Sequence, residues 1–309
     1  MALIEIDGIT YAYDAYGDPG GEPVLLLHGF AGCRANWEGL ARELAEEGFH
    51  AVAVDLPGHG ETSSPPDAER YRIERVAADL AALMDRLGLG RIHLLGYSMG
   101  GRAALTFASL YSNRLESLVL ESSSPGLATE EERRQRRKAD EELADRIEAR
   151  GMEWFVEYWS GLPLFATMRR LDRGVLERIR EQRLRLNPSG LANSLRGMGT
   201  GSQPSWWESL PRLNLPVLLI AGEEDEKYAA IAERMRRVLP SARMEIVPGA
   251  GHNVHLERPN VFRDLVVPFI RQRAQAKDIR LVRRDRTGKD GNDGCSRMGK
   301  SEGIYGYYL

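Results

Sequence analysis

The stretch Arg91-Ile92-His93-Leu94-Leu95-Gly96-Tyr97-Ser98-Met99-Gly100-Gly101-Arg102 decides how the rest of the chain is interpreted. An apolar run ends in the pattern Gly-x-Ser-x-Gly and passes into helix-forming residues, which predicts a strand, a sharp turn at Ser98 and a helix. Such a turn strains the serine backbone and brings neighbouring chain close, so Gly96 and Gly100 supply positions without a clashing Cβ. Ser98 is therefore a candidate catalytic residue, although a serine that only caps a helix gives the same short pattern.

The composition indicates one large globular unit with an insertion. The 309 residues are 42% hydrophobic and carry a formal net charge of -3, which allows a full core and argues against nucleic acid as the main partner. No apolar run approaches the roughly 18 to 20 residues needed to span a bilayer, and the start lacks a signal-peptide pattern. We expect a cytoplasmic protein without membrane insertion. Cys33 and Cys295 suggest neither a disulfide nor a metal site, and we expect no cofactor.

Apolar patterns on both sides of the opening stretch predict strands that alternate with helices. Such alternation indicates an α/β fold, with a mostly parallel sheet covered by helices on both faces. Its two parts would be residues 1–122 and 206–271. Besides the opening strand, we expect strands near residues 4–6, 10–13, 23–27, 51–54, 115–120, 215–221 and 242–247, and helices near 37–47, 73–87, 102–111, 228–238 and 259–271.

Residues 123–205 separate the two parts of this core and lose the strand pattern. From about residue 129 to 196 only helical periodicity remains, with aromatic residues on the apolar faces. We interpret this segment as an inserted helical cap. Residues 272–309 are rich in charge, Gly and Ser, and we expect them to form a disordered tail, because they could bury too little surface to offset their ordering entropy.

Three candidate residues each follow a predicted sheet strand, in the order Ser98, Asp225, His252. Loops at the carboxyl ends of parallel strands converge on one edge of the sheet, so we expect the three side chains to meet. His252 would accept a proton from Ser98, and Asp225 would orient the imidazole and stabilise its protonated form. The backbone amides of Phe30 and Met99 would bind a developing oxyanion.

Each of these residues taken alone also has a plainer explanation. A loop aspartate more often caps a helix than takes part in catalysis, and a single histidine is more often a surface or core residue. Order, spacing and strand context together favour the catalytic assignment. Two residues compete with Asp225, namely Glu223 and Glu224, and three histidines are candidates for structural or site-lining roles, namely His28, His59 and His255.

These features resemble the α/β-hydrolase fold. The resemblance rests on the His28-Gly29 loop, the segment from Asp55 to Thr62, the turn at Ser98 and the terminal Gly251-His252. The second of these segments departs from the family pattern, since Thr62 stands where the pattern has serine. Because the fold hosts esterases, peptidases, dehalogenases and lyases, it implies a class of mechanism without a substrate.

The cap and the arginine after the turn are similar to one narrower family over about residues 3 to 270, the 2-succinyl-6-hydroxy-2,4-cyclohexadiene-1-carboxylate synthases of menaquinone biosynthesis. The likeness lies in residues 96–102, 126–127, 163–165, 190–207 and 222–227. It implies a lyase that abstracts a ring proton from 2-succinyl-5-enolpyruvyl-6-hydroxy-3-cyclohexene-1-carboxylate and releases pyruvate. Ser98 would act as a general base, and charge on the succinyl carbonyl oxygen would lie in the oxyanion hole.

The same resemblance implies that arginines bind the carboxylates of this small-molecule substrate, since a planar guanidinium pairs with a carboxylate bidentately. The implied carboxylate ligands are Arg102, Arg136 and Arg183, with Arg185 as a competitor of Arg183, and the implied pocket-shaping residues are Tyr97 and Trp159. The charged segment from 130 to 150 suits a solvated amphipathic helix equally well.

Two other functions stay open at this stage. The first is a carboxylesterase or carbon-carbon bond hydrolase that uses the same three residues through an acyl-enzyme. The second is a non-catalytic binding protein with the same fold, against which the presence of Ser98, Asp225 and His252 argues. The sequence does not predict an oligomeric state.

Overall fold

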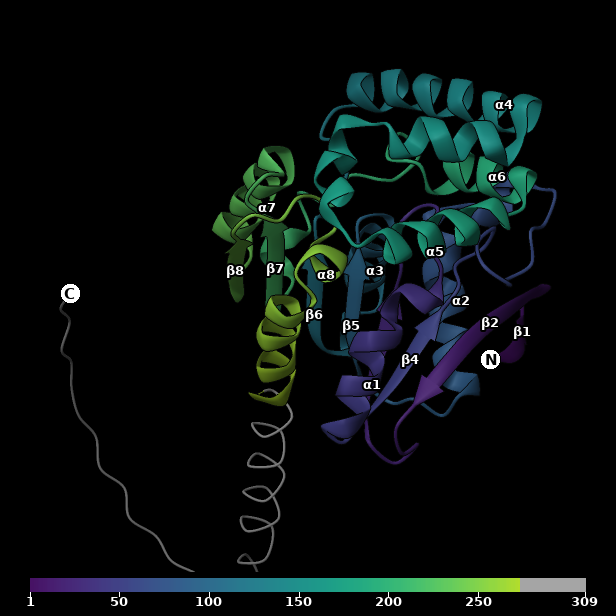
Figure 1. Ribbon diagram of the computed structural model, residues 1–309. Helices are drawn as coiled ribbons and strands as arrows, with labels where there is room; N and C mark the ends of the chain where they lie inside the picture. Colours follow the sequence, from purple (N-terminus) through teal and green to yellow (C-terminus); the bar gives the residue numbers. More distant parts are fainter. Residues whose placement is uncertain (273–309) are drawn as a thin grey trace, which may run out of the picture. The chain divides into compact units, whose positions relative to one another are not determined.

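An eight-stranded sheet runs through the computed structural model, which describes residues 1–272 (Figure 1). The strand order is β1-β2-β4-β3-β5-β6-β7-β8. The pairs β1/β2 and β2/β4 are antiparallel, and all other neighbours are parallel. The strands are β1 (Ala2–Ile6), β2 (Ile9–Tyr16), β3 (Glu22–Leu27), β4 (Phe49–Val54), β5 (Ile92–Tyr97), β6 (Leu115–Glu121), β7 (Val217–Gly222) and β8 (Ala242–Val247).

Helices cover both faces of this sheet, as the alternating pattern predicts. In Figure 1, α1 and the helical residues 259–272 lie in front of the strands, and α2 and α3 lie behind them. The α-helices are α1 (Glu38–Glu46), α2 (Ile73–Arg86), α3 (Met99–Leu110), α4 (Glu130–Ser160), α5 (Arg173–Leu184), α6 (Pro188–Met198), α7 (Glu226–Val238) and α8 (Val254–Glu257). Short 3-10 helices are η1 (Arg34–Trp37), η2 (Ala68–Tyr71), η3 (Ser112–Arg114), η4 (Pro163–Arg170) and η5 (Leu210–Arg212).

The central strands bring the loops of the candidate site together. β5 lies between β3 and β6, with Leu27 opposite Gly96 and Tyr97 opposite Glu121. All six residues of β5 are buried, which explains its continuous apolar pattern. Because these strands are parallel and end level with one another, the segments that follow them emerge at one edge of the sheet.

The turn after β5 is tight, and its helix begins earlier than the sequence predicts. α3 starts at Met99 and not at Arg102, since Ser98 itself is the residue before the first helical turn. Ser98 has φ 51° and ψ -108°, a backbone conformation that residues other than Gly rarely adopt. A Cβ on Gly96 would lie 2.3 Å from the carbonyl oxygen of Gly100, and a Cβ on Gly100 would lie 2.3 Å from that of Leu27. The two glycines therefore allow the backbone crossings that the turn requires.

The segment between β6 and β7 is helical, as expected for a cap. Between residues 122 and 216 the structure contains no strand, and α4, α5 and α6 lie above the strand ends in Figure 1. α4 begins with a capping box between Thr129 and Glu132 and contains one residue with non-helical angles, Gly151 at φ 77°. A separate hydrophobic cluster joins α4 to α6. The boundaries of the core and cap at residues 122 and 205 stay a prediction.

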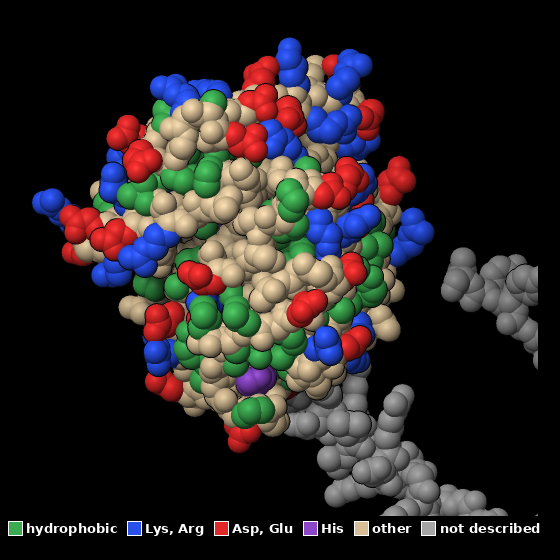
Figure 2. Space-filling view, turned by 90° about the vertical axis from the view of Figure 1, so that its right-hand side faces the viewer, with side chains coloured by type: hydrophobic (Ala, Val, Ile, Leu, Met, Phe, Trp, Pro, Cys, Tyr) green, Lys and Arg blue, Asp and Glu red, His purple; other side chains and the backbone are tan. Residues whose placement is uncertain are grey.

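The surface of the cap carries charged side chains of both signs, in keeping with the mixed charges of its sequence. Figure 2 shows acidic and basic side chains mixed over the top of the molecule, and many α4 charges form ion pairs, such as Arg133 with Glu130 and Arg196 with Glu141. Within residues 1–272 no helix combines the length and apolar character that a membrane crossing needs. Of the predicted tail, residues 273–309 lie outside the described part of the chain.

The backbone crossing at the turn gives a test of the fold. Replacing Gly96 by Ala places a methyl group against the Gly100 carbonyl, so we expect Gly96→Ala to lose several kcal/mol of stability or to fail to fold. Gly39→Ala is the matched control, because Gly39 lies in α1 with no atom within 4 Å of the added Cβ. Helix propensity predicts that this control gains up to about 1 kcal/mol. Urea unfolding of both variants measures the difference, and equal stabilities would contradict the crossing.

Candidate active site

Ser98, His252 and Asp225 form one hydrogen-bonded row. The Ser98 hydroxyl donates to His252 Nε2 over 3.0 Å, and His252 Nδ1 donates to Asp225 Oδ2 over 2.6 Å. His252 is 2% exposed and Asp225 is 5% exposed, so water competes little for these bonds. The structure thus brings together three side chains that lie far apart in sequence, in an arrangement that can move a proton from Ser98 to His252.

The structure also separates Asp225 from its two sequence competitors. Asp225 is buried at the start of α7, where its other oxygen accepts a bond from the Tyr228 amide at 3.4 Å. Glu224 is exposed and pairs with Arg170, and Glu223 accepts a bond from the Gly249 amide. Of these three carboxylates, only that of Asp225 contacts His252.

The two amides expected to form an oxyanion hole belong to residues that line the same cavity. Phe30 and Met99 both line the cavity that contains Ser98 and His252. Within residues 1–272, neither backbone amide donates a hydrogen bond to another group of the chain. Met99 also begins α3, so its amide carries the positive end of the helix dipole. Both donors are therefore available to a negatively charged oxygen.

This catalytic cavity is small and has an aromatic and cationic lining. Its volume is about 120 Å³. The residues that line it are Phe30, Ser98, Met99, Arg102, Arg136, Trp159, Leu164, Phe165, Ser194, Leu195, Met198, Gly199, Thr200, Lys227, Tyr228 and His252. The cap supplies about half of them, so the cap and the core build the cavity jointly.

Two arginines of the cavity differ in how their charge is compensated. Arg102 is 8% exposed and donates through Nη1 to the neutral acceptors Met198 O at 2.6 Å and Gln203 Oε1 at 3.2 Å. Burial lowers the pKa of Arg102 to about 10, so it stays charged at neutral pH. Arg136 is partly exposed and already pairs with Asp140 at 2.7 Å. Arg102 is therefore a buried cation without a carboxylate partner within residues 1–272.

The other residues implied by the resemblance take different places. Trp159 lines the catalytic cavity, and its buried indole Nε1 has no hydrogen-bond partner within residues 1–272. Tyr97 does not line that cavity, because its ring packs between His252 and His255 at centroid distances of 5.4 and 4.9 Å. Arg183 is buried and lines an adjoining pocket, while Arg185 is exposed beside Glu181.

Sequence reasoning did not single out two other cavity residues. Tyr228 is packed against His252 with ring centroids 4.6 Å apart, and Lys227 lies over the Tyr228 ring at 5.4 Å. Both lie in the first turn of α7, just after Asp225, so their proximity in sequence to a candidate residue is the one signal that could have found them. Within residues 1–272, no group of three or more His, Cys, Asp or Glu is placed to hold a metal ion.

His28 and His59 are neutral core residues next to the loop that carries Phe30. His28 donates from Nδ1 to Gly29 O and accepts the Leu56 amide at Nε2. The His59 ring packs against His28 and Phe30. Burial lowers the pKa of His28 to about 4 and that of His59 to about 3. Both rings are uncharged at neutral pH and support the loop that carries Phe30.

The third of these histidines, His255, belongs to a buried set of hydrogen bonds between the Ser98 turn and the segment after His252. Glu121 accepts the Ser98 amide at its backbone oxygen over 2.9 Å. Its side chain accepts the His255 amide over 3.0 Å and His255 Nδ1 over 2.8 Å. Glu121 thus holds the turn of Ser98 and the segment after His252 at once, and it is fully buried. No sequence pattern marked Glu121, because its role depends on contacts 134 residues apart.

Comparisons with known proteins agree with this geometry. The family profile of the alpha/beta hydrolase fold matches residues 22–259. The putative 2-succinyl-6-hydroxy-2,4-cyclohexadiene-1-carboxylate synthase of Bacillus subtilis (strain 168) is 48% identical over 85% of this chain and 96% of that protein. The structure of MenH from S. aureus matches with a TM-score of 0.81 and 32% identity, over 85% of this chain and 98% of that one. A thermophilic esterase from Thermogutta terrifontis, solved with malate bound, matches with a TM-score of 0.77 and 30% identity, over 88% of this chain and 99% of that one.

Because Glu121 connects the Ser98 turn to the segment after His252, removal of its side chain should lower the reactivity of Ser98. Glu121→Ala leaves the His255 amide and ring without an acceptor, which costs about 1–3 kcal/mol and releases the His252 segment. Glu121→Gln keeps one oxygen acceptor and is the matched control. We expect Glu121→Ala to slow labelling of Ser98 by a fluorophosphonate at least tenfold, and Glu121→Gln to slow it less. Equal labelling rates at a temperature where both variants are folded would contradict a positioning role.

The two neutral histidines predict an acid-sensitive fold. Because the folded pKa values of His28 and His59 lie below the usual value of about 6.5, the unfolded chain binds protons first. Their contribution to stability is complete above pH 6.5 and is lost as the pH falls, towards about 4 for His28 and towards about 3 for His59. For His59→Gln we expect the unfolding free energy between pH 6.5 and 4 to fall less steeply than in the wild type, by about 1.4 kcal/mol per pH unit. Urea titrations at several pH values measure these slopes, and identical slopes would refute the argument.

Proposed function

The chain belongs to the 2-succinyl-6-hydroxy-2,4-cyclohexadiene-1-carboxylate synthase family, and from this membership we propose a mechanism for pyruvate elimination at Ser98, His252 and Asp225. The 48% identity and the MenH structure make the chain a lyase of menaquinone biosynthesis with the α/β-hydrolase fold. Its substrate in this assignment is 2-succinyl-5-enolpyruvyl-6-hydroxy-3-cyclohexene-1-carboxylate. The roles of the individual residues are part of the proposal.

The reaction breaks one carbon-hydrogen bond and one carbon-oxygen bond of the substrate. A proton leaves the ring carbon that bears the succinyl group, and its electron pair forms a new ring double bond. The existing ring double bond moves one position, and the enolpyruvyl oxygen leaves the ring with its bonding pair. The released enolpyruvate takes up a proton and becomes pyruvate. The ring thus becomes the diene of the product without oxidant, reductant or water.

Ser98 is the residue that we propose to take the ring proton. As the hydroxyl gives its own proton to His252 Nε2 across 3.0 Å, its oxygen becomes basic enough to remove a proton from carbon. Asp225 stabilises the resulting imidazolium through the bond of 2.6 Å to Nδ1. The strained turn supports this role, because it holds the Ser98 hydroxyl at the cavity wall and the amide of Met99 beside it.

The oxyanion hole would stabilise the charge that the proton transfer creates. When the ring proton leaves, negative charge spreads onto the succinyl carbonyl oxygen as an enolate. The amides of Phe30 and Met99, which have no partner within residues 1–272, are suited to bind that oxygen. Donors that are fixed before the reaction cost no reorganisation, so they lower the energy of the enolate more than water would.

The uncompensated charge of Arg102 is the observation that carries this function. A buried guanidinium that bonds only to neutral oxygens is costly unless an anion completes the site. The substrate supplies carboxylates, and Arg102 lines the same cavity as Ser98. We assign Arg102 as a carboxylate ligand, with Arg136 as a second cation of the cavity. Trp159, with its unpaired indole Nε1, would contact the substrate as well.

A hydrolase is the second candidate, because the esterase from Thermogutta terrifontis shares the fold at 30% identity. In that case Ser98 would attack a carbonyl carbon and form an acyl-enzyme, with the same residues in the same positions. The two candidates differ in what the site must bind. An uncharged ester needs no buried cation for its binding, whereas the polycarboxylate substrate of the lyase gives Arg102 an ion-pair partner.

Pyruvate release separates the two candidates. We expect the purified protein to release pyruvate from the enolpyruvyl substrate, followed through lactate dehydrogenase and NADH, and to hydrolyse p-nitrophenyl acetate slowly or not at all. Ser98→Ala removes the base, so pyruvate release should fall at least a thousandfold while the circular dichroism spectrum and Tm stay the same. Rapid ester hydrolysis without pyruvate release would reject the lyase mechanism.

The assignment of Arg102 predicts a defect in kcat/KM. Arg102→Met removes the charge and should lower kcat/KM about 10- to 100-fold, because a hydrogen bond between charged groups contributes about 1.5–3 kcal/mol. Arg102→Lys keeps the charge without the planar guanidinium, so its kcat/KM should lie between those of the wild type and Arg102→Met. Arg185→Met, at an exposed position of the cap, is the matched control and should keep wild-type kinetics. An unchanged kcat/KM in Arg102→Met would remove this residue from the site.

Some expectations about this function stay predictions. They are a cytoplasmic location, the lack of a cofactor, and a small-molecule partner as opposed to nucleic acid or a membrane. The formal net charge of -3 supports the last of these, since a protein that binds nucleic acid usually carries excess positive charge.

A further inference from the structure

The elimination of pyruvate calls for a proton donor as well as a base. Ser98 takes the ring proton in the proposed mechanism, but the enolpyruvyl oxygen leaves with a negative charge unless a group of the protein gives it a proton. A new charge inside a cavity with little water is unfavourable when it has no partner. A proton donor in the same cavity as Ser98 would therefore assist the cleavage of the carbon-oxygen bond.

Few side chains of the catalytic cavity are suited to donate this proton. Apart from Ser98 and His252, the lining residues with an N–H or O–H group on the side chain are Arg102, Arg136, Trp159, Ser194, Thr200, Lys227 and Tyr228. A guanidinium does not act as an acid near neutral pH. Aliphatic hydroxyls and the indole are much weaker acids than an ammonium or a phenol. The remaining donors in this cavity are thus the Lys227 ammonium and the Tyr228 phenol.

These two donors differ in their surroundings. Lys227 is an exposed residue, and its ammonium lies over the Tyr228 ring, 5.4 Å from the centroid. Tyr228 packs against the ring of the catalytic His252, with the centroids 4.6 Å apart. Its hydroxyl makes no hydrogen bond to any group of residues 1–272. The proton of Tyr228 is therefore available to a bound molecule, next to the group that accepts the proton of Ser98.

The charges around Tyr228 suit an acid. Burial, with a smaller contribution from Asp225, raises the pKa of Tyr228 above its usual value, although Arg102 and Arg136 act in the opposite direction. The phenol is thus protonated at neutral pH, as an acid must be before it reacts. When its proton has left, the positive charges of the same two arginines stabilise the phenolate.

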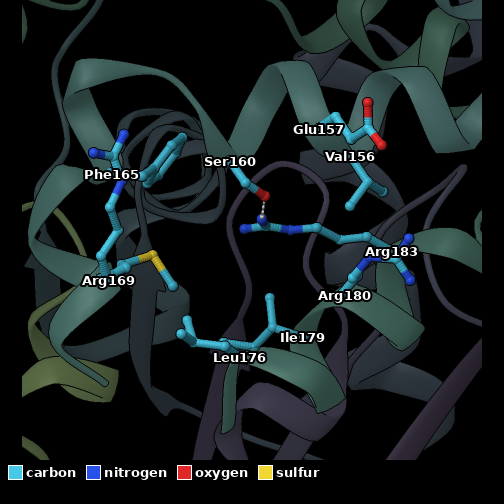
Figure 3. Close-up of a pocket in the computed structure, with 10 residues that line it drawn as sticks. Val156, Glu157, Ser160, Phe165, Arg169, Leu176, Ile179, Arg180 and Arg183 are labelled. Atoms are coloured by element: carbon cyan, nitrogen blue, oxygen red, sulfur yellow. Dashed lines mark hydrogen bonds between the residues drawn. The ribbon is translucent and has the colours of Figure 1, made fainter. Parts of the chain in front are cut away.

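The size of the cavity brings Tyr228 close to a substrate ring at Ser98. The cavity volume is about 120 Å³, and Phe165 lines both this cavity and the neighbouring pocket of the cap. Figure 3 shows that pocket, where Arg183 reaches across to Ser160 and Phe165 lies on another side. The carbon that bears the enolpyruvyl group lies across the six-membered ring from the carbon that loses its proton. A ring held at Ser98 in so small a space presents this second carbon to the other residues of the cavity.

We propose that Tyr228 is the catalytic acid of the elimination and donates its phenol proton to the enolpyruvyl oxygen as the carbon-oxygen bond breaks. This role rests on the proposed function of Ser98 as the base. The O–H bond of Tyr228 breaks, its proton joins the departing oxygen, and the bonding pair of the carbon-oxygen bond leaves with that oxygen. The enol form of pyruvate results. It becomes pyruvate when its hydroxyl proton is exchanged for one on its methylene carbon.

His252 restores the acid after each reaction. At that point Ser98 carries the proton from the ring, His252 is an imidazolium and Tyr228 is a phenolate. Because the His252 and Tyr228 rings are in contact, the imidazolium can return its proton to the phenolate, directly or through one water molecule. All three groups then have their starting protonation, and the cycle consumes no proton from solvent.

A single hydroxyl deletion tests the role of Tyr228. Tyr228→Phe removes the donor and keeps the ring against His252, so we expect kcat for pyruvate release to fall about 100-fold and KM to change by less than about threefold. Tyr158→Phe is the matched control and should keep wild-type kinetics, because Tyr158 stacks on Trp154 and does not line the catalytic cavity. A wild-type kcat in Tyr228→Phe would overturn the proposal.

Hydrogen exchange separates acid catalysis from a packing effect. In D2O the ring carbon takes up deuterium each time the enolate returns to substrate before the carbon-oxygen bond breaks. Tyr228→Phe slows only this second step, so recovered substrate should gain deuterium at least about tenfold faster than pyruvate is released. The wild type should release pyruvate faster than it exchanges. Mass spectrometry of the recovered substrate measures the exchange, and an equal loss of exchange and release in Tyr228→Phe would overturn the proposal.

Two further variants in the same assay identify the acid and the base separately. Ser98→Ala should lose both exchange and release, because no enolate forms. Exchange that persists in Ser98→Ala would reject the base of the proposed function, whereas a coupled loss in Tyr228→Phe would reject the acid alone. Lys227→Met tests the other candidate donor. If this variant, and not Tyr228→Phe, separates exchange from release, the acid is Lys227 and the proposal is wrong.

Discussion

The close backbone crossing at Ser98 is the constraint on which the rest of the structure depends. Ser98 can adopt φ 51° at the end of β5 because Gly96 and Gly100 leave no Cβ in the way of neighbouring carbonyls. The crossing fixes the start of α3 at Met99 and presents an amide beside the hydroxyl. His252 and Asp225 then need only to arrive at the same edge of the sheet, which the parallel strands ensure. Glu121 connects the Ser98 turn to the segment after His252, since its backbone oxygen accepts the Ser98 amide and its buried carboxylate accepts from His255.

The distribution of compensated and uncompensated charge distinguishes structure from function in the cap. Many arginines there pair with acids of the same or a neighbouring helix, and such surface pairs contribute little to stability. Arg183 of the cap and Arg102 of α3 in the core are different, because both are buried and bond only to neutral groups. Two such cations, one in each of two cavities, suit a ligand with several carboxylates. This agrees with the substrate of the synthase family to which the chain belongs.

The hydrogen-bonded row of Ser98, His252 and Asp225 suits both hydrolase and lyase chemistry, because the two kinds of reaction have shared requirements. Both need an activated serine oxygen and donors for an oxygen that becomes negatively charged. What differs is whether the cavity presents a carbonyl carbon or an acidic C–H bond to Ser98. The cap supplies Trp159, Phe165 and Arg136 to the cavity, and the core supplies Ser98 and His252. In the proposed mechanism, substrate choice therefore depends on the insertion and the proton path depends on the core.

Local patterns in the sequence determined the alternating strands and helices, the turn at Ser98, the order of the three catalytic candidates and the family resemblance, because each depends on short-range periodicity or on residues adjacent in the chain. Where neighbouring residues have similar side chains, tertiary structure decided which of them is placed in the site. Asp225 and not Glu224 reaches His252, Arg183 and not Arg185 is buried, and Tyr97 supports His252 from behind the cavity. The physical reason is that burial and pairing depend on contacts between distant segments. A side chain one or two positions along a helix or loop points to a different environment. Residue type and spacing alone do not predict that environment.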